Sequence, residues 1–198
     1  MTAPAAAIET LSGGAVRAAV PELARLRVEV FRDWPYLYDG DLAYERRYLA
    51  KYAGIEDATI VVARVGGRIV GASTALPLAK AEPEMQRPFR DAGLDPRDWY
   101  YFGESVLEAA HRGRGIGVAF FRAREERAAA LGYRRTTFCA VERPEDHPLR
   151  PAGHVPLDAF WMKRGYRKVD GLTGEFSWRD VGETTKTKKP MQFWMKAL

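Results

Sequence analysis

The strongest constraint on the fold is residues 104–131, where a strand pattern, a glycine-rich loop and a helix pattern follow one another. The run that leads into the loop, residues 99–107, is rich in aromatic and β-branched side chains on both alternating faces. This pattern is typical of a strand in the centre of a sheet. After the loop, one helical stripe carries the apolar side chains of Ile116, Phe120, Ala123 and Leu131. Gly132 follows at a position suited to a left-handed helix cap.

The loop itself favours an anion. Gly113, Gly115 and Gly117 lack the Cβ atom that keeps a backbone away from a ligand. The free N–H groups of the helix start, the helix dipole, and the side chains of Arg112 and Arg114 all attract negative charge. We therefore predict a diphosphate-binding loop, with a merely tight strand-to-helix turn as the alternative.

The rest of the chain reads as one α/β domain spanning residues 1–198. A glycine pair at Gly66 and Gly67 between two apolar runs predicts a β-hairpin. Pro21 suits a helix start, and the lysine-containing run 186–189 suits a solvated hairpin tip. We expect strands at 8–11, 59–65, 68–75, 99–107, 135–141, 166–169, 175–178 and 191–195, and helices at 21–31, 41–52, within 83–98, at 118–131 and at 157–164.

Composition excludes several classes of function. The net charge of +5 is spread along the chain, so a polyanionic cofactor explains it at least as well as nucleic acid does. Cys139 is the only cysteine and the histidines lack ligand spacing, so we expect neither a disulfide nor a metal. No apolar run approaches the ~20 residues of a membrane span, and we expect a cytoplasmic protein.

The loop sequence Arg112-Gly113-Arg114-Gly115-Ile116-Gly117 fits the pattern Arg/Gln-x-x-Gly-x-Gly/Ala between a central strand and a helix. Downstream follow the strand 136–141 and a helix that ends in Gly165-Tyr166. Over residues 98–170 the chain thus resembles a GNAT-type N-acetyltransferase.

The resemblance implies a mixed central sheet, flanked by helices and splayed into a V where two parallel strands bind acetyl-CoA as cosubstrate. The backbone of Val106 and Leu107 would bond the pantetheine arm. The pyrophosphate would be held by the loop amides of Arg112, Gly113, Arg114, Gly115, Ile116 and Gly117. An acceptor amine would attack the thioester directly, while a base removes its proton and an acid protonates the CoA thiolate.

Glu104 is the first candidate for the base, because an unpaired charge inside an otherwise apolar strand carries a large burial penalty. The alternative is a structural pair with an arginine such as Arg32 or Arg143. Glu142, at the end of the neighbouring strand, and Glu108, close to the loop, are the next candidates. Cys139 is better explained as a core residue than as a nucleophile.

The position of the expected general acid departs from the family pattern. The tyrosine that the family places four residues before the glycine of Gly165-Tyr166 is Trp161 here, and an indole is not a useful proton donor. Tyr166 occupies the position of a packing aromatic. The choice therefore stays open between another tyrosine and no dedicated acid.

The aromatic segment 32–48 is the expected acceptor element, with Arg32, Tyr36 and Tyr38 as substrate-binding candidates. For Trp34 and Tyr44 a hydrophobic staple between two helices is the alternative. The acceptor would be a primary amine of a small metabolite or peptide. A non-catalytic acyl-CoA sensor is the rival function, and Phe193 and Trp194 on a protruding hairpin suggest a homodimer.

Overall fold

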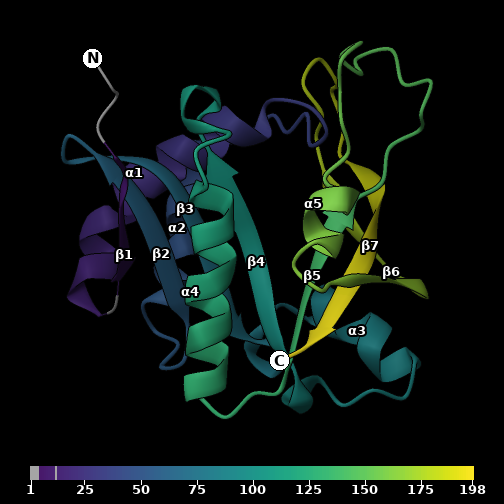
Figure 1. Cartoon of the computed structure of the whole chain (residues 1–198). Helices are drawn as coiled ribbons and strands as arrows, with labels where there is room; N and C mark the ends of the chain where they lie inside the picture. Colours follow the sequence, from purple (N-terminus) through teal and green to yellow (C-terminus); the bar gives the residue numbers. More distant parts are fainter. Residues whose placement is uncertain (1–4, 12) are drawn as a thin grey trace.

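The computed structural model describes residues 5–11 and 13–198, and one mixed seven-stranded sheet runs through them (Figure 1). The strand order is β1-β2-β3-β4-β5-β7-β6. The strands are β1 (Ala7–Leu11), β2 (Thr59–Val65), β3 (Arg68–Pro77), β4 (Tyr100–Leu107), β5 (Arg135–Val141), β6 (Arg167–Trp178) and β7 (Thr187–Ala197). The helices are α1 (Gly14–Phe31), α2 (Leu42–Tyr52), α3 (Pro83–Asp91), α4 (Ile116–Ala130) and α5 (Asp158–Met162). Short 3₁₀ turns are η1 (Leu78–Lys80), η2 (Pro96–Asp98) and η3 (Ala109–His111).

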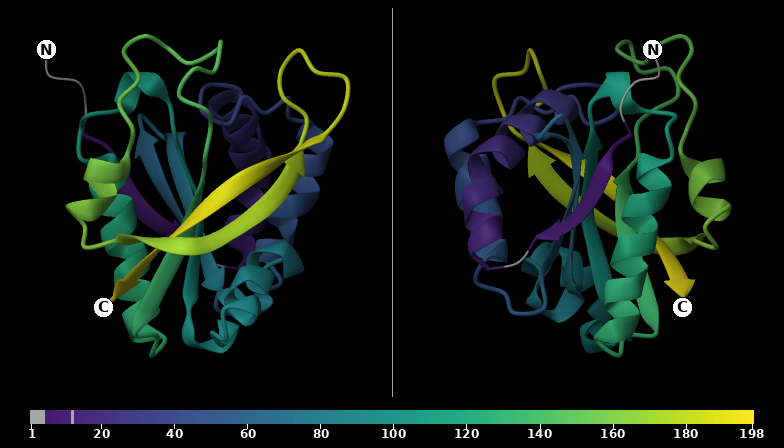
Figure 2. Two further views of the ribbon diagram at one scale, coloured as in Figure 1. Left: turned by 90° about the vertical axis from the view of Figure 1, so that its right-hand side faces the viewer. Right: turned by 60° about the vertical axis from the view of Figure 1, so that its left-hand side comes forward.

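Helices cover both faces of the sheet, which confirms the expected α/β class (Figure 2). On one face, α1 and α2 bury residues such as Leu26 and Leu49 against Val62 and Tyr101. On the other face, α4 packs Phe120 against β2 and β3 in one cluster. A second cluster joins α4 to β4, β5 and β7. Alternate side chains of the central strands therefore belong to different layers.

The expected helix start at Pro21 is wrong, because α1 begins at Gly14 and carries Pro21 inside it. A proline in a helix interior removes one backbone donor and costs about 3 kcal/mol. Val16 and Val20 extend the buried stripe N-terminal of the proline, and their burial offsets that cost. By contrast, Asp41 caps α2 as expected, accepting a bond from the Tyr44 N–H at 2.7 Å.

The predicted hairpin is confirmed, with β2 and β3 paired antiparallel around Gly66 and Gly67. Both glycines have positive φ, 57° and 82°, as a tight two-residue hairpin turn requires.

The C-terminal strands differ from expectation in two ways. Residues 167–169 of the first run and all of 175–178 belong to a single strand, β6, which is interrupted by a register shift between Lys168 and Thr173; Tyr166 lies just before it. Strand β7 is internal from Met191 onward, where it lies between β5 and β6, and only its first residues, Thr187 to Lys189, pair with β6 alone. Phe193 and Trp194 are buried there, and Lys189 is buried in β7 rather than on a solvated tip. The exposed aromatic surface expected for a dimer is thus not formed by these two residues.

Strands β4 and β5 are parallel neighbours that separate along their length. They pair at Tyr100 with Thr136 and at Tyr101 with Thr137, and no later pair follows. Figure 1 shows their ribbons close at the start and apart at the end. We call the unpaired parts, from Phe102 in β4 and from Phe138 in β5, the splay.

Candidate active site

The glycine-rich loop connects the splay to α4. Gly113 and Gly115 have φ values of 74° and 80°, and a Cβ on either would meet no atom within 4 Å. The backbone conformation, rather than crowding, therefore demands glycine. Among the described residues, the N–H groups from Gly113 to Val118 donate to no protein acceptor. Together with the exposed side chains of Arg112 and Arg114, this helix start fits a diphosphate.

The edge of β4 that faces the splay fits an extended, amide-containing chain. Val106 and Leu107 pair with Ala72 and Gly71 of β3 on one side, and with no residue of β5 on the other. Ser105 is exposed although its strand is central. The Leu107 carbonyl accepts a hydrogen bond from Arg112 Nε at 3.3 Å, and the other backbone groups of this edge are open to a peptide-like partner that binds as an added strand.

A β-bulge in β4 decides where Glu104 points. Ser73 of β3 pairs with Ser105 and Ala75 pairs with Phe102, so Gly103 and Glu104 together stand opposite one residue of β3. In a regular strand Glu104 would share the α4 face with Phe102. The extra residue turns it to the face that α1 and α2 cover.

On that face Glu104 belongs to a buried ion triad. Arg27 of α1 contacts Glu45 of α2 through Nε and Glu104 through Nη1, each at 2.5 Å. Relative side-chain exposure is 11%, 1% and 8% for Arg27, Glu45 and Glu104. The two carboxylates hold the pKa of Arg27 above its usual value despite the opposing effect of burial. Glu104 therefore has an arginine partner, but neither of the expected ones.

Arg32 and Arg143 lie elsewhere. The Arg32 side chain is exposed and pairs with Asp39 at 3.4 Å. Arg143 is buried against Asp180 at 2.8 Å. The expectation that one of them pairs with Glu104 is wrong, because α1 places Arg27 directly behind the bulge.

The triad has spare acceptor capacity and unbalanced charge. Oε1 of Glu45 and Oε1 of Glu104 are buried without a hydrogen bond, since the contact from Arg27 to the latter lacks hydrogen-bond geometry. Two carboxylates against one guanidinium leave one net negative charge. A buried site of this kind favours a cation.

Four tyrosines surround the triad. The Tyr48 ring lies 4.6 Å from the Arg27 guanidinium, and the Tyr48 and Tyr52 hydroxyls are 3.2 Å apart. Burial, reinforced by the negative charge of Glu104, raises the pKa of both phenols. Tyr36 has Cys139 of β5, Glu104 of β4 and Arg27 as electrostatic neighbours, and burial raises its pKa. Tyr38 stands beside Glu45, and its pKa is raised by burial and by that carboxylate.

The segment 32–40, which we call the acceptor segment, is fixed from the C-terminal half of the chain. The Tyr36 carbonyl accepts hydrogen bonds from Arg143 at 2.7 Å and from the Trp178 indole at 2.9 Å. Arg143 also donates to the Pro35 carbonyl at 2.9 Å. The Val181 N–H donates a backbone hydrogen bond to the Leu37 carbonyl at 2.7 Å. Tyr36 and Tyr38 are thereby held beside the triad, whereas Arg32 projects outward.

The other carboxylate candidates are paired near the surface. Arg68 forms two hydrogen bonds with Glu108, at 2.5 and 2.8 Å, and lowers the pKa of that carboxyl. Glu142 directly follows β5 and accepts a hydrogen bond from Lys168 at 2.8 Å, with both side chains partly exposed. Cys139 is buried, as expected of a core residue, and burial raises its pKa to about 12.

Trp161 is partly buried and packs against Phe138 and Trp194 of a core cluster, with ring centroids 5.1 Å from each. The Tyr166 hydroxyl contacts Thr136 at 2.9 Å and Glu125 at 3.1 Å, in the α4 layer. His147 and His154 flank the Trp34 ring, so these three residues join the acceptor segment to the β5–α5 loop.

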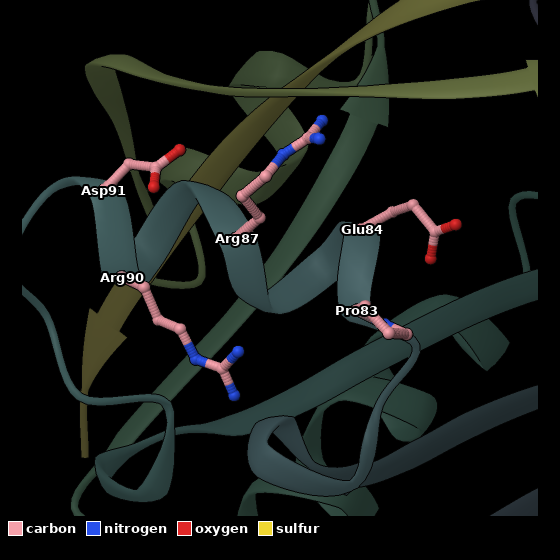
Figure 3. A pocket seen from close by; sticks show the side chains of 5 residues that line it. All are labelled: Pro83, Glu84, Arg87, Arg90 and Asp91. Atoms are coloured by element: carbon pink, nitrogen blue, oxygen red, sulfur yellow. The ribbon is translucent and has the colours of Figure 1, made fainter.

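One hollow lies apart from the splay and the triad. A hollow of about 310 Å³ on α3 is lined by Pro83, Glu84, Arg87, Arg90 and Asp91, all on one short helix away from the loop (Figure 3). Within the described residues, no set of three or more histidine, cysteine or acidic side chains is placed to hold a metal ion. Among the helices described, none is long and apolar enough to cross a membrane.

Sequence reasoning missed Arg27, and it gave Glu45 no catalytic weight. A signal exists for both. Arg27 is four positions from Leu23 and from Phe31, and Glu45 is four from Leu49, so each charge interrupts a buried helical stripe.

Comparison with known proteins identifies the family and the fold. The Acetyltransferase (GNAT) family matches residues 23–152, while a search of curated proteins finds no match. Among solved structures, a ribosomal-protein-alanine N-acetyltransferase from Brucella melitensis is 16% identical with a TM-score of 0.64, covering 97% of this chain and 99% of its own. A phosphinothricin acetyltransferase from Sinorhizobium meliloti, in complex with acetyl-CoA, is 16% identical with a TM-score of 0.63, covering 98% and 89%.

A third structure, yncA from Salmonella typhimurium with its cofactor acetyl-CoA, is 10% identical with a TM-score of 0.60, covering 98% of this chain and 95% of its own. At these identities the neighbours establish the fold, and the family match spans most of the chain. The splayed strands and the glycine loop are thus those of a GNAT fold. The chain belongs to the GNAT family and is an acetyl-CoA-dependent acetyltransferase.

Proposed function

We propose that this enzyme acetylates a primary amine that binds as an ammonium ion beside Glu104, and that Glu104 accepts its proton. The observation that carries the proposal is the bulge, which turns a buried carboxylate toward α1, α2 and the acceptor segment. Acetyl-CoA supplies the acetyl group as an activated thioester, which the free amine attacks with release of the CoA thiol.

The charge of the triad supports a cationic acceptor. With Glu45 and Glu104 ionised and Arg27 protonated, an ammonium ion brings the buried charge to zero. Moving a proton from the ammonium to Glu104 keeps it at zero, because Arg27 remains paired with Glu45. Neither state leaves an uncompensated buried charge, which would cost several kcal/mol by roughly the usual burial penalty.

In this proposal the cofactor is held by the residues that the sequence singled out. The open edge of β4 at Val106 and Leu107 bonds the pantetheine arm, and the loop from Arg112 to Gly117 holds the pyrophosphate. Tyr36 and Tyr38 contact the acceptor, while Arg32, which is exposed, acts at the entrance. Glu142 is the alternative base, and the acetylation rates of the Glu104→Gln and Glu142→Gln variants distinguish the two.

The acceptor is a small amine or a peptide amine, and the names of the neighbours suggest what to try. A panel assay of thiol release with acetyl-CoA should include phosphinothricin, other small primary amines, a peptide beginning with alanine and a lysine peptide. We expect turnover with at least one of them. Tight acetyl-CoA binding without turnover on any amine would instead favour the acyl-CoA sensor.

A homodimer and a cytoplasmic location stay sequence-based predictions. Light scattering of the purified protein and fractionation of cells that express the tagged chain measure them directly.

A further inference from the structure

Arg124 of α4 is the largest fully buried side chain of the described chain, with 1% exposure. It lies on the inward stripe of α4, four positions from Phe120 and from Ala128, where an apolar residue is expected. Within the described residues it forms no ion pair with any carboxylate. Burial lowers its pKa to about 10, so it stays charged at neutral pH.

The donors of Arg124 converge on the backbone around the bulge. Nη1 donates to the Thr74 carbonyl of β3 at 3.3 Å and to the Glu104 carbonyl of β4 at 3.5 Å. Nε donates to the Phe120 carbonyl of its own helix at 3.2 Å. The guanidinium also lies 4.3 Å from the Phe102 ring centroid, just before the bulge. One side chain thus ties α4 to both strands where their register shifts.

On the opposite face of the sheet, Thr74 and Gly103 also stabilise the bulge. The Thr74 hydroxyl accepts from the Glu104 N–H at 3.3 Å and is also 3.3 Å from the Tyr52 hydroxyl. A Cβ on Gly103 would lie 2.4 Å from that hydroxyl oxygen, so only glycine fits. Bulges expose backbone groups that the ladder no longer satisfies, and here they bond to Arg124 on one face and Thr74 on the other.

Packing alone does not explain a cation at this position. A buried charge without a carboxylate costs several kcal/mol by roughly the usual penalty, and methionine would fill a similar volume without it. What methionine cannot do is donate hydrogen bonds to two carbonyl groups on neighbouring strands.

We propose that Arg124 is a positioning residue, which fixes the β4 bulge and thereby holds the Glu104 carboxylate on the acceptor side of the sheet. The inference rests on the role proposed for Glu104. Arg124 contacts neither the acceptor nor the triad side chains and acts only through the backbone.

A double-mutant cycle tests this. The variants are Arg124→Met, Glu104→Gln, and both together, with Arg122→Met on the exposed face of α4 as the matched control. For Arg124→Met we expect kcat to fall on the order of 100-fold, the cost of a misplacement of about 1 Å, with acetyl-CoA affinity changed less than about threefold. In the Glu104→Gln background the same change should lower kcat by less than about threefold, because the group it positions is already lost.

Equal fold-losses in both backgrounds would overturn the inference, since they would mean that Arg124 only supports general stability. Thermal melting shows whether Arg124→Met folds. If it does not fold, Arg124→Lys replaces it in the cycle, because lysine keeps the charge but not the paired donors. A crystal structure of the Arg124 variant supplies a readout independent of turnover. We expect Ser105 to lose its register with Ser73 and Glu104 to leave Arg27, and an unchanged bulge contradicts the proposal. If the wild type acetylates no amine, the proposed function fails. The crystal structure of the Arg124 variant still shows whether Arg124 fixes the bulge.

Discussion

Replacing Arg27 by methionine should destabilise the protein in a pH-dependent way. The guanidinium is the shared partner of two buried carboxylates, each at 2.5 Å. Removing one partner of a buried ion pair costs about 3–5 kcal/mol. Loss of its position over the Tyr48 and Phe31 rings, 4.6 and 5.0 Å away, adds about 1 kcal/mol. Because methionine keeps much of the apolar contact of the stem, we expect a loss of about 4 kcal/mol at pH 8.

The sign of the pH dependence follows from the charges left behind. In the folded variant, Glu45 and Glu104 are buried without a counter-charge, so they hold protons to a higher pH than in the unfolded chain. The stability of the variant relative to the wild type therefore rises as the pH falls, by at most about 1.4 kcal/mol per pH unit for each proton. Between pH 8 and pH 5 we expect about 2 kcal/mol of the loss to be recovered.

Urea unfolding at the two pH values measures this effect. Arg25→Met is the control on the same helix, because Arg25 is itself partly exposed. Its pair with Glu29 is exposed and its contact with Glu108 is long, at 3.7 Å, so the change should cost less than about 1 kcal/mol. Adding Glu45→Gln to Arg27→Met should recover part of the loss at pH 8. A loss that is the same at pH 5 and pH 8 would refute the electrostatic account of the triad.

The remaining predictions concern the loop, the acceptor segment and the core. Gly115→Val should abolish acetyl-CoA binding measured by calorimetry, because φ at this position is 80°, and retained affinity would contradict the loop assignment. The control Gly132→Val, with φ of 86° at the end of α4, should lower only the melting temperature. Arg143→Met should raise the KM for the amine about tenfold by loosening the acceptor segment, with a smaller change in the KM for acetyl-CoA. A larger rise in the KM for acetyl-CoA than in the KM for the amine would mean that the segment binds the cofactor. Cys139 should resist iodoacetamide at pH 8 in the native protein and react in urea, since burial raises its pKa to about 12; rapid native labelling would show an accessible thiol.

Local patterns predicted the fold well because its determinants are local. The hairpin at Gly66-Gly67 and the cap at Asp41 depend on residues adjacent in sequence. The extension of α1 past Pro21 was missed, because it depends on tertiary burial of Val16 and Val20 overriding a helix-start signal.

The candidate site was predictable only in part. Glu104 was identified from its charge in an apolar strand, but its direction depends on a bulge that no residue type signals alone. Arg27, Arg32 and Arg143 are all distant from Glu104 in sequence, and which of them pairs with it depends on tertiary packing that local patterns do not specify. Arg27 and Arg124 share one detectable trait, a charge on the buried stripe of an amphipathic helix.

The central claim is that Glu104 accepts the proton of the acceptor amine. Once the panel has identified an amine, its acetylation rate by Glu104→Gln, compared with Glu142→Gln across pH 6–9 at saturating acetyl-CoA, tests the claim most directly. We expect Glu104→Gln to lower kcat by about 10²–10⁴-fold without changing acetyl-CoA affinity, and Glu142→Gln to stay within about twofold of the wild type. A Glu104→Gln enzyme that keeps the wild-type rate and pH profile would contradict the claim, and a loss confined to Glu142→Gln would move the base to the end of β5.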